Sequence, residues 1–486
     1  MAERAGDLFA LVDRPRAPVR PAGRFAWVAD AMPALVLLCA LAPAVWLPDG
    51  IPGPARLALF AFGAAAVLWT LTGLNGAYVA LGAALFLVLT GAVGEDALFG
   101  ALSSDVVWLL IGTFIAGRAF ETSGLAARMI ATLCRGLATV GGLSWRLALG
   151  LIPLTFVIPS TSGQAAATRP LLDALAAAGG DRRVTRAFAL LIPAVLLVST
   201  ISSLVGAASH LIANDLLARL GGERIGFGRW ALYGLPLGLL ASLCTAWVVG
   251  RLFLTAELRG RPLEVTHAPA GPVTAPEWRT AAITAGMVAL WVTTGSHPLG
   301  IALVAVAGGF ALTTPGLGVL SWKAGLKAVN WNLVLFIGAA LTLGEALIST
   351  GAAKWLVGRV VDASGFGEGG SPLFTVLALA FVSLTSHLYF ASHSARAAAM
   401  LPPLLFLAQS SGLKPAAVMF IATAGMDYCL TFPFSSKALA VFQEVGGEPA
   451  WSPPDLLKLS AVMLPIHAVL IVALYFGWWR HVGLAL

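Results

Sequence analysis

Apolar runs separated by short polar segments extend along almost the whole chain. A helix needs about 20 residues to cross the hydrocarbon core of a bilayer, and eleven runs approach or exceed that length. They lie at about 26–47, 55–73, 76–94, 105–123, 187–219, 230–252, 280–294, 298–313, 328–350, 415–443 and 458–480. Two further apolar blocks, 144–178 and 372–411, each contain a small polar segment. The pattern predicts an all-α polytopic membrane protein with about eleven transmembrane helices.

The composition agrees with a chain that lies in a lipid bilayer. Hydrophobic residues make up 58% of the chain and charged residues 11%, whereas a soluble domain carries about 25% charged residues. The mean hydropathy is +0.88, which excludes a water-soluble globule. The cysteines are far apart and mostly lie within apolar runs, so they are interpreted as small buried hydrophobes. They are Cys39, Cys134, Cys244 and Cys429.

The net charge of +7 does not indicate a nucleic-acid partner, because the basic residues lie in short loops beside apolar runs, a pattern that fixes membrane orientation. Residues 1–24 contain five arginines and are predicted to form a cytoplasmic N-terminal tail. Glu95 and Asp96 then face the outside, and the C-terminus ends there. This orientation requires blocks 144–178 and 372–411 to enter and leave on the same side, so each is predicted to be a re-entrant helical hairpin. The alanine- and arginine-rich composition suggests a bacterial inner membrane.

The polar segments of the two hairpins are copies of each other. STSGQAAATRP, from Ser160 to Pro170, and SHSARAAAMLP, from Ser392 to Pro402, share six of eleven positions. Non-helical backbone at membrane depth is tolerated only where protein or a water-filled cavity lines it. Each hairpin is followed by a helix that small and polar residues interrupt. The order of parts is repeated with reversed sidedness, as in the inverted repeats of secondary transporters, so tips and broken helices are expected to converge on one midplane site.

The predicted organisation follows from this repeat. It comprises the tail 1–24, scaffold helices 25–94, a first inverted repeat 95–252 (hairpin 144–178, broken helix 187–219), a cytoplasmic linker 253–279, scaffold helices 280–326 and a second inverted repeat 327–486 (hairpin 372–411, broken helix 415–443).

Tips and broken helices offer free backbone groups and short hydroxyls, which bind anions at helix N-termini and small cations at carbonyls. The serines are equally suited to cap the helix that follows each tip, and Gln164 lies beside them. The predicted substrate-binding residues are Ser160, Thr161, Ser162, His210, Ser392, His393, Ser394, Arg396, Ser435, Ser436 and Lys437.

Charged and titratable residues in this set leave alternatives open. A charge within the membrane is costly unless it is paired or functional, so Arg396 is expected to contact the substrate, to pair with Asp427 or to reach solvent. The same alternatives hold for Lys437. His210 and His393 are proton carriers, anion donors or ordinary core histidines.

Three other charged residues are expected to have structural roles. Arg118 and Glu121 are three positions apart on one helical face and are expected to pair. Glu345, at the related place in the second repeat, is assigned a structural role.

At the tips and breaks the chain resembles the divalent anion:sodium symporter family, over about residues 27 to 482. That family's tips read Ser-Asn-Thr with a proline ten positions after the serine, and Pro170 and Pro402 fall at that spacing. Both tip asparagines are replaced, by Thr161 and His393. The family's broken-helix motif, Gly-Thr-Pro-Pro-Asn, is rewritten as Gly-Ala-Ala-Ser-His, which begins at Gly206.

The resemblance implies a homodimeric elevator-type transporter of dicarboxylates, citrate or sulfate. It also implies sodium near Ser160, Ser162, Gly206, Ser392 and Ser394. The departures at the tips favour sodium-independent exchange or proton coupling, with fixed positive charge in place of sodium. No cofactor other than sodium or a proton is expected.

Three rivals remain open. A cation/proton antiporter or arsenite-type permease of the same superfamily needs a carboxylate at the tips or breaks, where Asp427 is the near candidate. A membrane-embedded enzyme needs a nucleophile, an acid–base pair or a metal cluster, and no loop carries Asp, Glu and His at ligand spacing. A channel is disfavoured because hairpins from both sides block a continuous pore. The chain is therefore expected to be a transporter and no enzyme.

Overall fold

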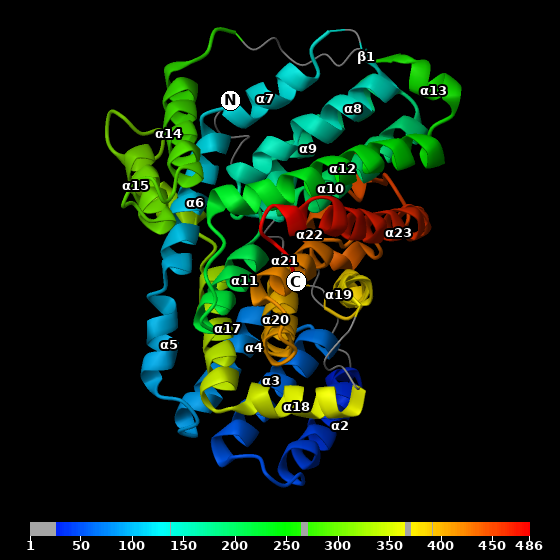
Figure 1. The fold of residues 1–486 in the computed structure, drawn as a ribbon. Coiled ribbons are helices and arrows are strands. Elements are labelled where there is room, and N and C mark those ends of the chain that lie inside the picture. Colours follow the sequence, from blue (N-terminus) through cyan, green and yellow to red (C-terminus); the bar gives the residue numbers. More distant parts are fainter. Residues whose placement is uncertain (1–25, 137, 264–270, 365–370, 391) are drawn as a thin grey trace.

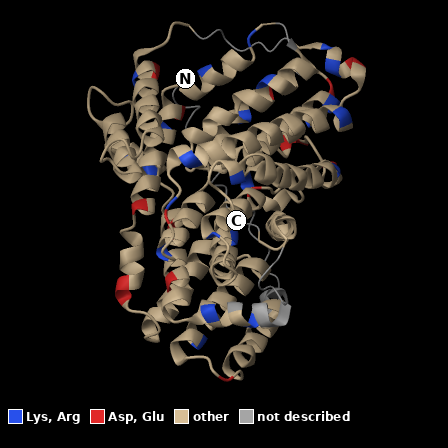
Figure 2. Ribbon diagram, viewed as in Figure 1, with Lys and Arg blue, Asp and Glu red and all other residues tan. Residues whose placement is uncertain are grey.

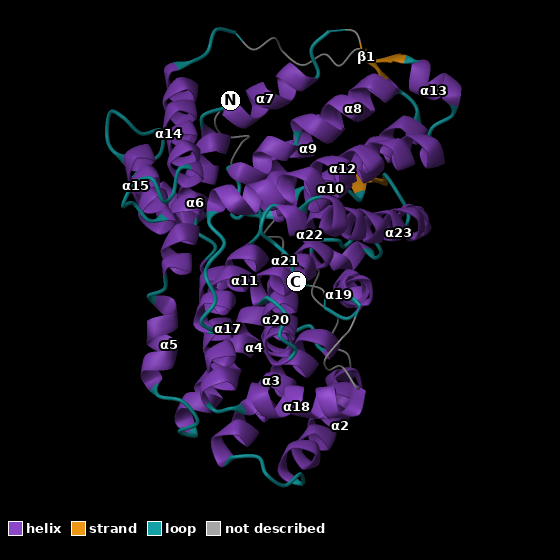
Figure 3. Ribbon diagram, viewed as in Figure 1, coloured by secondary structure: helices purple, strands orange, loops and turns teal. Residues whose placement is uncertain are grey.

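The computed structural model describes residues 26–136, 138–263, 271–364, 371–390 and 392–486. The predicted tail 1–24 and residues 264–270 of the predicted linker lie outside them. The described chain is almost entirely helical (Figures 1 and 3). Its strands form two short antiparallel pairs, β1 (Ala138–Thr139) with β2 (Pro262–Leu263) and β3 (Glu444–Val445) with β4 (Glu448–Pro449).

The helices follow one another with short connections. In the first half they are α2 (Ala26–Trp46), α3 (Gly53–Leu71), α4 (Gly76–Leu89), α5 (Glu95–Leu102), α6 (Asp105–Thr122), α7 (Leu125–Leu133), α8 (Val140–Gly150), η1 (Ile152–Phe156), α9 (Thr161–Gly179), α10 (Arg182–Val198), η2 (Thr200–Ser202), α11 (Ala208–Arg219) and α12 (Phe227–Phe253). In the second half they are α13 (Ala256–Gly260), α14 (Ala275–Val292), α15 (Ile301–Thr313), α16 (Trp322–Ala328), α17 (Trp331–Ser349), α18 (Ala352–Ser364), α19 (Pro372–Thr385), η3 (Ser386–Leu388), α20 (His393–Ser410), α21 (Pro415–Met426), η4 (Pro433–Ser435), α22 (Lys437–Val441), α23 (Pro453–Gly477) and η5 (Trp479–His481).

Six helical stretches of the described chain are long and apolar enough to span a membrane. Six further apolar helices are shorter. The fold is thus that of a helical polytopic membrane protein, and the number of about eleven spans stays a prediction.

The block 144–178 forms two helices, α8 and α9, joined by the turn η1, and the block 372–411 forms α19 and α20, joined by η3. After each of them a helix is interrupted. The chain leaves α10 at Val198 and resumes in α11 at Ala208, and it leaves α21 at Met426 and resumes in α22 at Lys437.

These elements pack in a crossed arrangement. Helix α9 contacts α10 and α22, whereas α20 contacts α21 and α11. The second arm of each helical pair therefore lies against broken-helix segments from both halves of the chain. This packing brings the two interruptions together in the buried interior.

Small residues allow close helix approach, as is typical of membrane bundles. Helix α6 packs against α15 where a Cβ on Gly112 would lie 2.3 Å from the carbonyl carbon of Ala305. Helix α12 packs against the first interruption where a Cβ on Gly234 would lie 1.9 Å from the carbonyl oxygen of Ile201. Larger side chains at these glycines would push the helices apart.

The short helices that precede the two helical pairs lie at opposite ends of the molecule, α7 at one end and α18 at the other (Figure 1). Arg128 of α7 donates to Glu277 at the start of α14, with Nε 2.7 Å from Oε1. Charged residues are sparse and lie mainly at helix ends and in connections (Figure 2). The few charged residues of the interior therefore stand out as candidates for function.

Candidate functional site

The chain turns before α9 and again before α20, and we call these turns the first and the second tip. Both tips have the same helix cap. Ser160 is the N-cap of α9, and its hydroxyl accepts from the backbone N–H of Gly163 at 3.3 Å. Ser392 is the N-cap of α20, and its hydroxyl accepts from Ala395 N–H at 3.4 Å. The interpretation of these two serines as helix caps is confirmed.

A longer side chain closes each tip in the same way. In the first tip, Nε2 of Gln164 donates to the carbonyl of Ile158 at 2.8 Å. In the second tip, Nη2 of Arg396 donates to the carbonyl of Phe390 at 3.0 Å. Each donor lies four residues after its cap serine, and each acceptor lies two residues before it. Arg396 thus has a structural bond that any amide or guanidinium of this reach can form.

The resemblance of the tips extends to the turn before them. Thr155 donates through Oγ1 to the carbonyl of Ile152 at 2.8 Å. His387, which is also five residues before its cap serine, has Nδ1 2.5 Å from the carbonyl of Leu384. The likeness of the two segments therefore covers more of the chain than the eleven aligned letters.

Arg396 also joins the second tip to the second interruption. Its Nη1 donates to the carbonyl of Met426, the last residue of α21. The side chain is 0% exposed and its Nε has no partner. Among the described residues no carboxylate lies within ion-pair distance of it, and the expected alternative of a pair with Asp427 is wrong. The guanidinium is a buried positive charge held by neutral carbonyls.

Asp427 pairs with His210 across the two interruptions. Nε2 of His210, in α11, lies 2.7 Å from Oδ2 of Asp427, which follows α21. Nδ1 of the same ring lies 2.9 Å from the carbonyl of Ser203. The two side chains are 0% and 1% exposed. His210 is therefore a core histidine with a carboxylate partner.

A third group lies between Asp427 and the second tip. The thiol of Cys429 lies 2.9 Å from Nε2 of His393 and donates to the carbonyl of Asp427 at 3.5 Å. Nδ1 of His393 is buried without a partner. The interpretation of the cysteines as buried hydrophobes is wrong for Cys429, which takes part in polar contacts, and for Cys39, which is exposed. We call Arg396, His210, Asp427, His393 and Cys429 the second-tip cluster.

A chain of hydrogen bonds connects this cluster region to α23. Nε2 of His387 lies 2.5 Å from Oγ1 of Thr431, which lies 2.7 Å from Oγ of Ser460. The hydroxyl of Tyr428 lies 3.0 Å from the same Ser460 oxygen. These contacts fix the backbone of the second interruption against a neighbouring helix.

The other predicted site residues lie outside the second-tip cluster. Lys437 is exposed at the start of α22, and Ser436 caps that helix by accepting from Ala438 N–H at 3.2 Å. Ser435 is buried with an unpartnered hydroxyl. Thr161, Ser162 and Ser394 begin the helices after the tips, and Ser394 is the buried one. Within the described residues no hydrogen bond connects Ser160, Thr161 or Ser162 with the cluster.

Two of the serines predicted to lie near sodium already take part in the protein's own hydrogen bonds. The hydroxyls of Ser160 and Ser392 accept from backbone N–H groups. Beside Gly206, the carbonyl of Ser203 accepts from Gly206 N–H at 3.0 Å and from His210. A cation at these atoms would compete with those bonds, and sodium near the tips stays a prediction.

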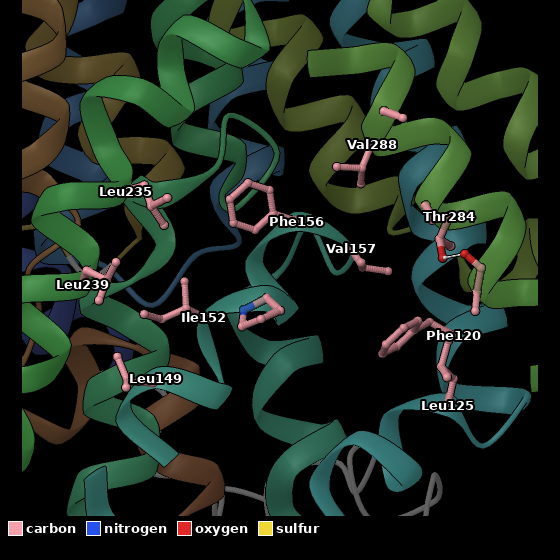
Figure 4. A pocket seen from close by; sticks show the side chains of 14 residues that line it. Phe120, Leu125, Leu149, Ile152, Phe156, Val157, Leu235, Leu239, Thr284 and Val288 are labelled. Atoms are coloured by element: carbon pink, nitrogen blue, oxygen red, sulfur yellow. Dashed lines mark hydrogen bonds between the residues drawn. The ribbon is translucent and has the colours of Figure 1, made fainter. Parts of the chain in front are cut away.

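An apolar cavity of about 700 Å³ lies beside the first tip and apart from the cluster. Its lining includes Phe156 of η1, Leu235 of α12 and Val288 of α14, which Figure 4 shows around the opening. Such a lining offers no group for an anion. The second-tip cluster, in contrast, brings buried ionisable groups together.

Two further ion pairs of the described residues are only partly buried. Arg118 donates to Glu121 at 3.2 Å, as expected for a pair three positions apart. Glu345 accepts from Arg219 at 3.2 Å, which gives it the structural role assigned to it. The sequence did not place Cys429 or His387 in the site, although His387 occupies the position that Thr155 occupies before the first tip.

Comparisons with known proteins agree with this architecture. A family model described as the sodium:sulfate symporter transmembrane region matches residues 27–485. A membrane protein of Cupriavidus necator is 30% identical over 321 residues, which are 63% of this chain and 62% of that protein. A citrate/succinate antiporter of Escherichia coli is 25% identical over 407 residues, 77% of this chain and 78% of that protein.

A solved structure shows the same fold. The crystal structure of the YdaH transporter of Alcanivorax borkumensis matches 90% of this chain and 100% of that chain, with a TM-score of 0.51 and 16% sequence identity. This likeness concerns the fold alone. Because the family model covers nearly the whole chain, the protein belongs to the sodium:sulfate symporter family, and its resemblance to the divalent anion:sodium symporters is confirmed.

Proposed function

We propose that this chain is a secondary carrier that moves small di- or trivalent anions, such as dicarboxylates, citrate or sulfate, across a membrane. The family and the citrate/succinate antiporter relative support this class of substrate. They are transporters, which also supports a role without chemical catalysis. The structural observation that carries the proposal is Arg396, a buried cation without a carboxylate partner among the described residues.

The physical argument is electrostatic. A buried charge costs several kcal/mol of desolvation unless an opposite charge compensates it, and an intramembrane arginine is for this reason a mark of a substrate pathway. The two carbonyls that hold Arg396 supply partial charges only. An anion at the second tip would supply the missing opposite charge, so the site favours anions over neutral solutes.

The finer architecture belongs to the same proposal. Segments 95–252 and 327–486 form an inverted repeat with re-entrant hairpins, and their tips and broken helices move as a unit against the scaffold. The crossed packing of α9 and α20, and the opposite places of α7 and α18, support this arrangement. The homodimer rests on the family resemblance. The inner-membrane location, with the N-terminus inside and the C-terminus outside, rests on composition and charge pattern.

Transport in this proposal does not depend on sodium. The fixed charge of Arg396 offsets part of the anion's charge, and the hydroxyls of Ser160 and Ser392 are engaged in hydrogen bonds. The rival cation/proton antiporter would bind its cation at Asp427. Arg396 counts against it, because Met426, whose carbonyl holds the guanidinium, directly precedes Asp427, and like charges repel strongly in a low-dielectric interior.

The test is transport by the full chain in proteoliposomes. Vesicles are loaded with unlabelled succinate, citrate or sulfate, and uptake of the labelled anion is followed with and without sodium, beside vesicles that lack the protein. We expect saturable uptake of at least one of these anions in sodium-free medium. Uptake that requires a sodium gradient would contradict the coupling, and the absence of uptake of every anion would contradict the function.

A further inference from the structure

The hydrogen bonds of the His210–Asp427 pair accommodate a shared proton. The carbonyl of Ser203 can only accept, so Nδ1 of His210, 2.9 Å away, carries a hydrogen. A contact of 2.7 Å between Nε2 and Oδ2 of Asp427 also needs a hydrogen between the two atoms. With both hydrogens in place the pair is neutral as a whole, whether the shared proton is on the ring or on the carboxyl group.

The charge of the second-tip cluster depends on this proton. With the proton in place, the pair is neutral and Arg396 gives the cluster one net positive charge. Without it, the carboxylate of Asp427 offsets Arg396 and the cluster is neutral. Arg396 and Asp427 belong to the same local field, because the guanidinium donates to the carbonyl of Met426, the residue before Asp427.

Other titratable groups surround the pair. Trp230 of α12 covers the ring of His210, with ring centroids 5.0 Å apart. The groups from the other elements packed around it are Arg396 and His393 of α20, His387 of η3, Tyr428 and Cys429 of the second interruption, and His467 of α23. Among them Arg396 is the permanent charge.

We propose that the proton shared by His210 and Asp427 is bound and released together with the transported anion. The inference rests on the proposed function. An anion near Arg396 stabilises the cluster form with net positive charge, and by thermodynamic reciprocity the proton strengthens anion binding by the same factor. The empty, deprotonated cluster is neutral and crosses without an unpaired buried charge.

The experiment measures protons taken up when succinate binds to the purified full-length protein. Calorimetric titrations at about pH 8, where carboxylic acids are fully ionised, are carried out in sodium-free buffers of different ionisation enthalpy. We expect net uptake of up to about one proton per succinate, and binding that weakens by up to about tenfold per pH unit as the pair loses its proton. Succinate binding without proton uptake at any pH would overturn the inference and leave the proposed function standing.

Two variants change the net charge of the second-tip cluster in opposite directions. Asp427→Asn keeps a hydrogen-bond partner for His210 but fixes the cluster charge, so we expect binding with the same affinity at about pH 7 and about pH 8 and no linked proton. His210→Gln leaves the carboxylate beside Arg396, and binding should weaken at both pH values. His467→Gln changes another buried histidine and should keep the proton linkage of the wild type.

The outcomes separate the two proposals. A pH-dependent Asp427→Asn variant would overturn the assignment of the proton to this pair. If the variants do not fold, the buffer series on the wild-type protein still decides whether a proton accompanies the anion. If succinate, citrate and sulfate all fail to bind the wild-type protein, the proposed function is wrong, and the inference falls with it.

Discussion

At the first hairpin tip the side chain that reaches back to the carbonyl of Ile158 is the neutral amide of Gln164, whereas at the second tip the guanidinium of Arg396 reaches back to Phe390. Both bonds span the same number of residues and close the same turn. The comparison separates two functions of one position. Closing the tip needs a donor of sufficient length, and the positive charge is an addition that only the second tip carries.

The same comparison extends to the interrupted helices beyond the tips. The second interruption contains a carboxylate, Asp427, which is tied to His210 of the first, and it contains the thiol of Cys429. The described contacts of the first tip involve no charged partner at Gln164 or Ser160. The halves therefore share a scaffold of hydrogen bonds, and the ionisable chemistry is concentrated in the second.

The largest effect is expected from Arg396→Gln. The variant gives the second tip the residue of the first, so the bond to Phe390 is retained while the charge is lost. Removal of a buried charge that contacts an anion costs about 2 kcal/mol or more, which is roughly 30-fold in affinity. Sodium-free anion exchange in proteoliposomes measures it, with Lys414→Gln, the loss of an exposed charge at the start of α21, as the control. Equal loss of anion exchange in the two variants would contradict the claim that the buried charge of Arg396 binds the anion.

The next effect concerns the first tip alone. Gln164→Met keeps the volume but leaves the carbonyl of Ile158 without its donor, and an unsatisfied buried carbonyl costs about 1–3 kcal/mol. The unpartnered Oε1 of Gln164 offsets part of this loss. We expect a lower midpoint of thermal unfolding together with retained anion exchange. Loss of exchange with an unchanged midpoint would show that the first tip contacts the anion directly.

Smaller effects are expected from the two cap serines. Ser160→Ala and Ser392→Ala each remove an N-cap, which costs about 1 kcal/mol of stability. Because the caps have the same geometry, the two variants should lower the unfolding midpoint by similar amounts. A Ser392→Ala variant that loses transport while Ser160→Ala retains it would assign Ser392 to the substrate.

The smallest effect is expected from Lys437→Gln. Lys437 is exposed, and loss of an exposed charge changes affinity by about 1 kcal/mol or less, or less than about fivefold. Initial rates of anion exchange measure it beside Arg396→Gln. If Lys437→Gln lost more activity than Arg396→Gln, the positive charge that matters would lie on α22.

The sequence was sufficient for the family, the helical class, the capping role of Ser160 and Ser392 and the pair of Arg118 with Glu121. These features depend on composition and on residues close together in the chain. The pair of His210 and Asp427 could not be predicted, because the two residues are 217 positions apart and their meeting depends on how the interrupted helices cross. The structural bond of Arg396 was accessible in principle, since Gln164 occupies the matching place in the repeat.

The central claim is that the charge of Arg396, in excess of its structural bond, makes the second tip the anion site. Its most direct test is equilibrium binding of labelled succinate or citrate to purified wild-type protein and Arg396→Gln in sodium-free buffer, with the unfolding midpoint measured on the same samples. The account predicts an affinity at least about 30-fold lower in the variant, which still unfolds in a cooperative transition. Equal affinity in the two proteins would contradict it.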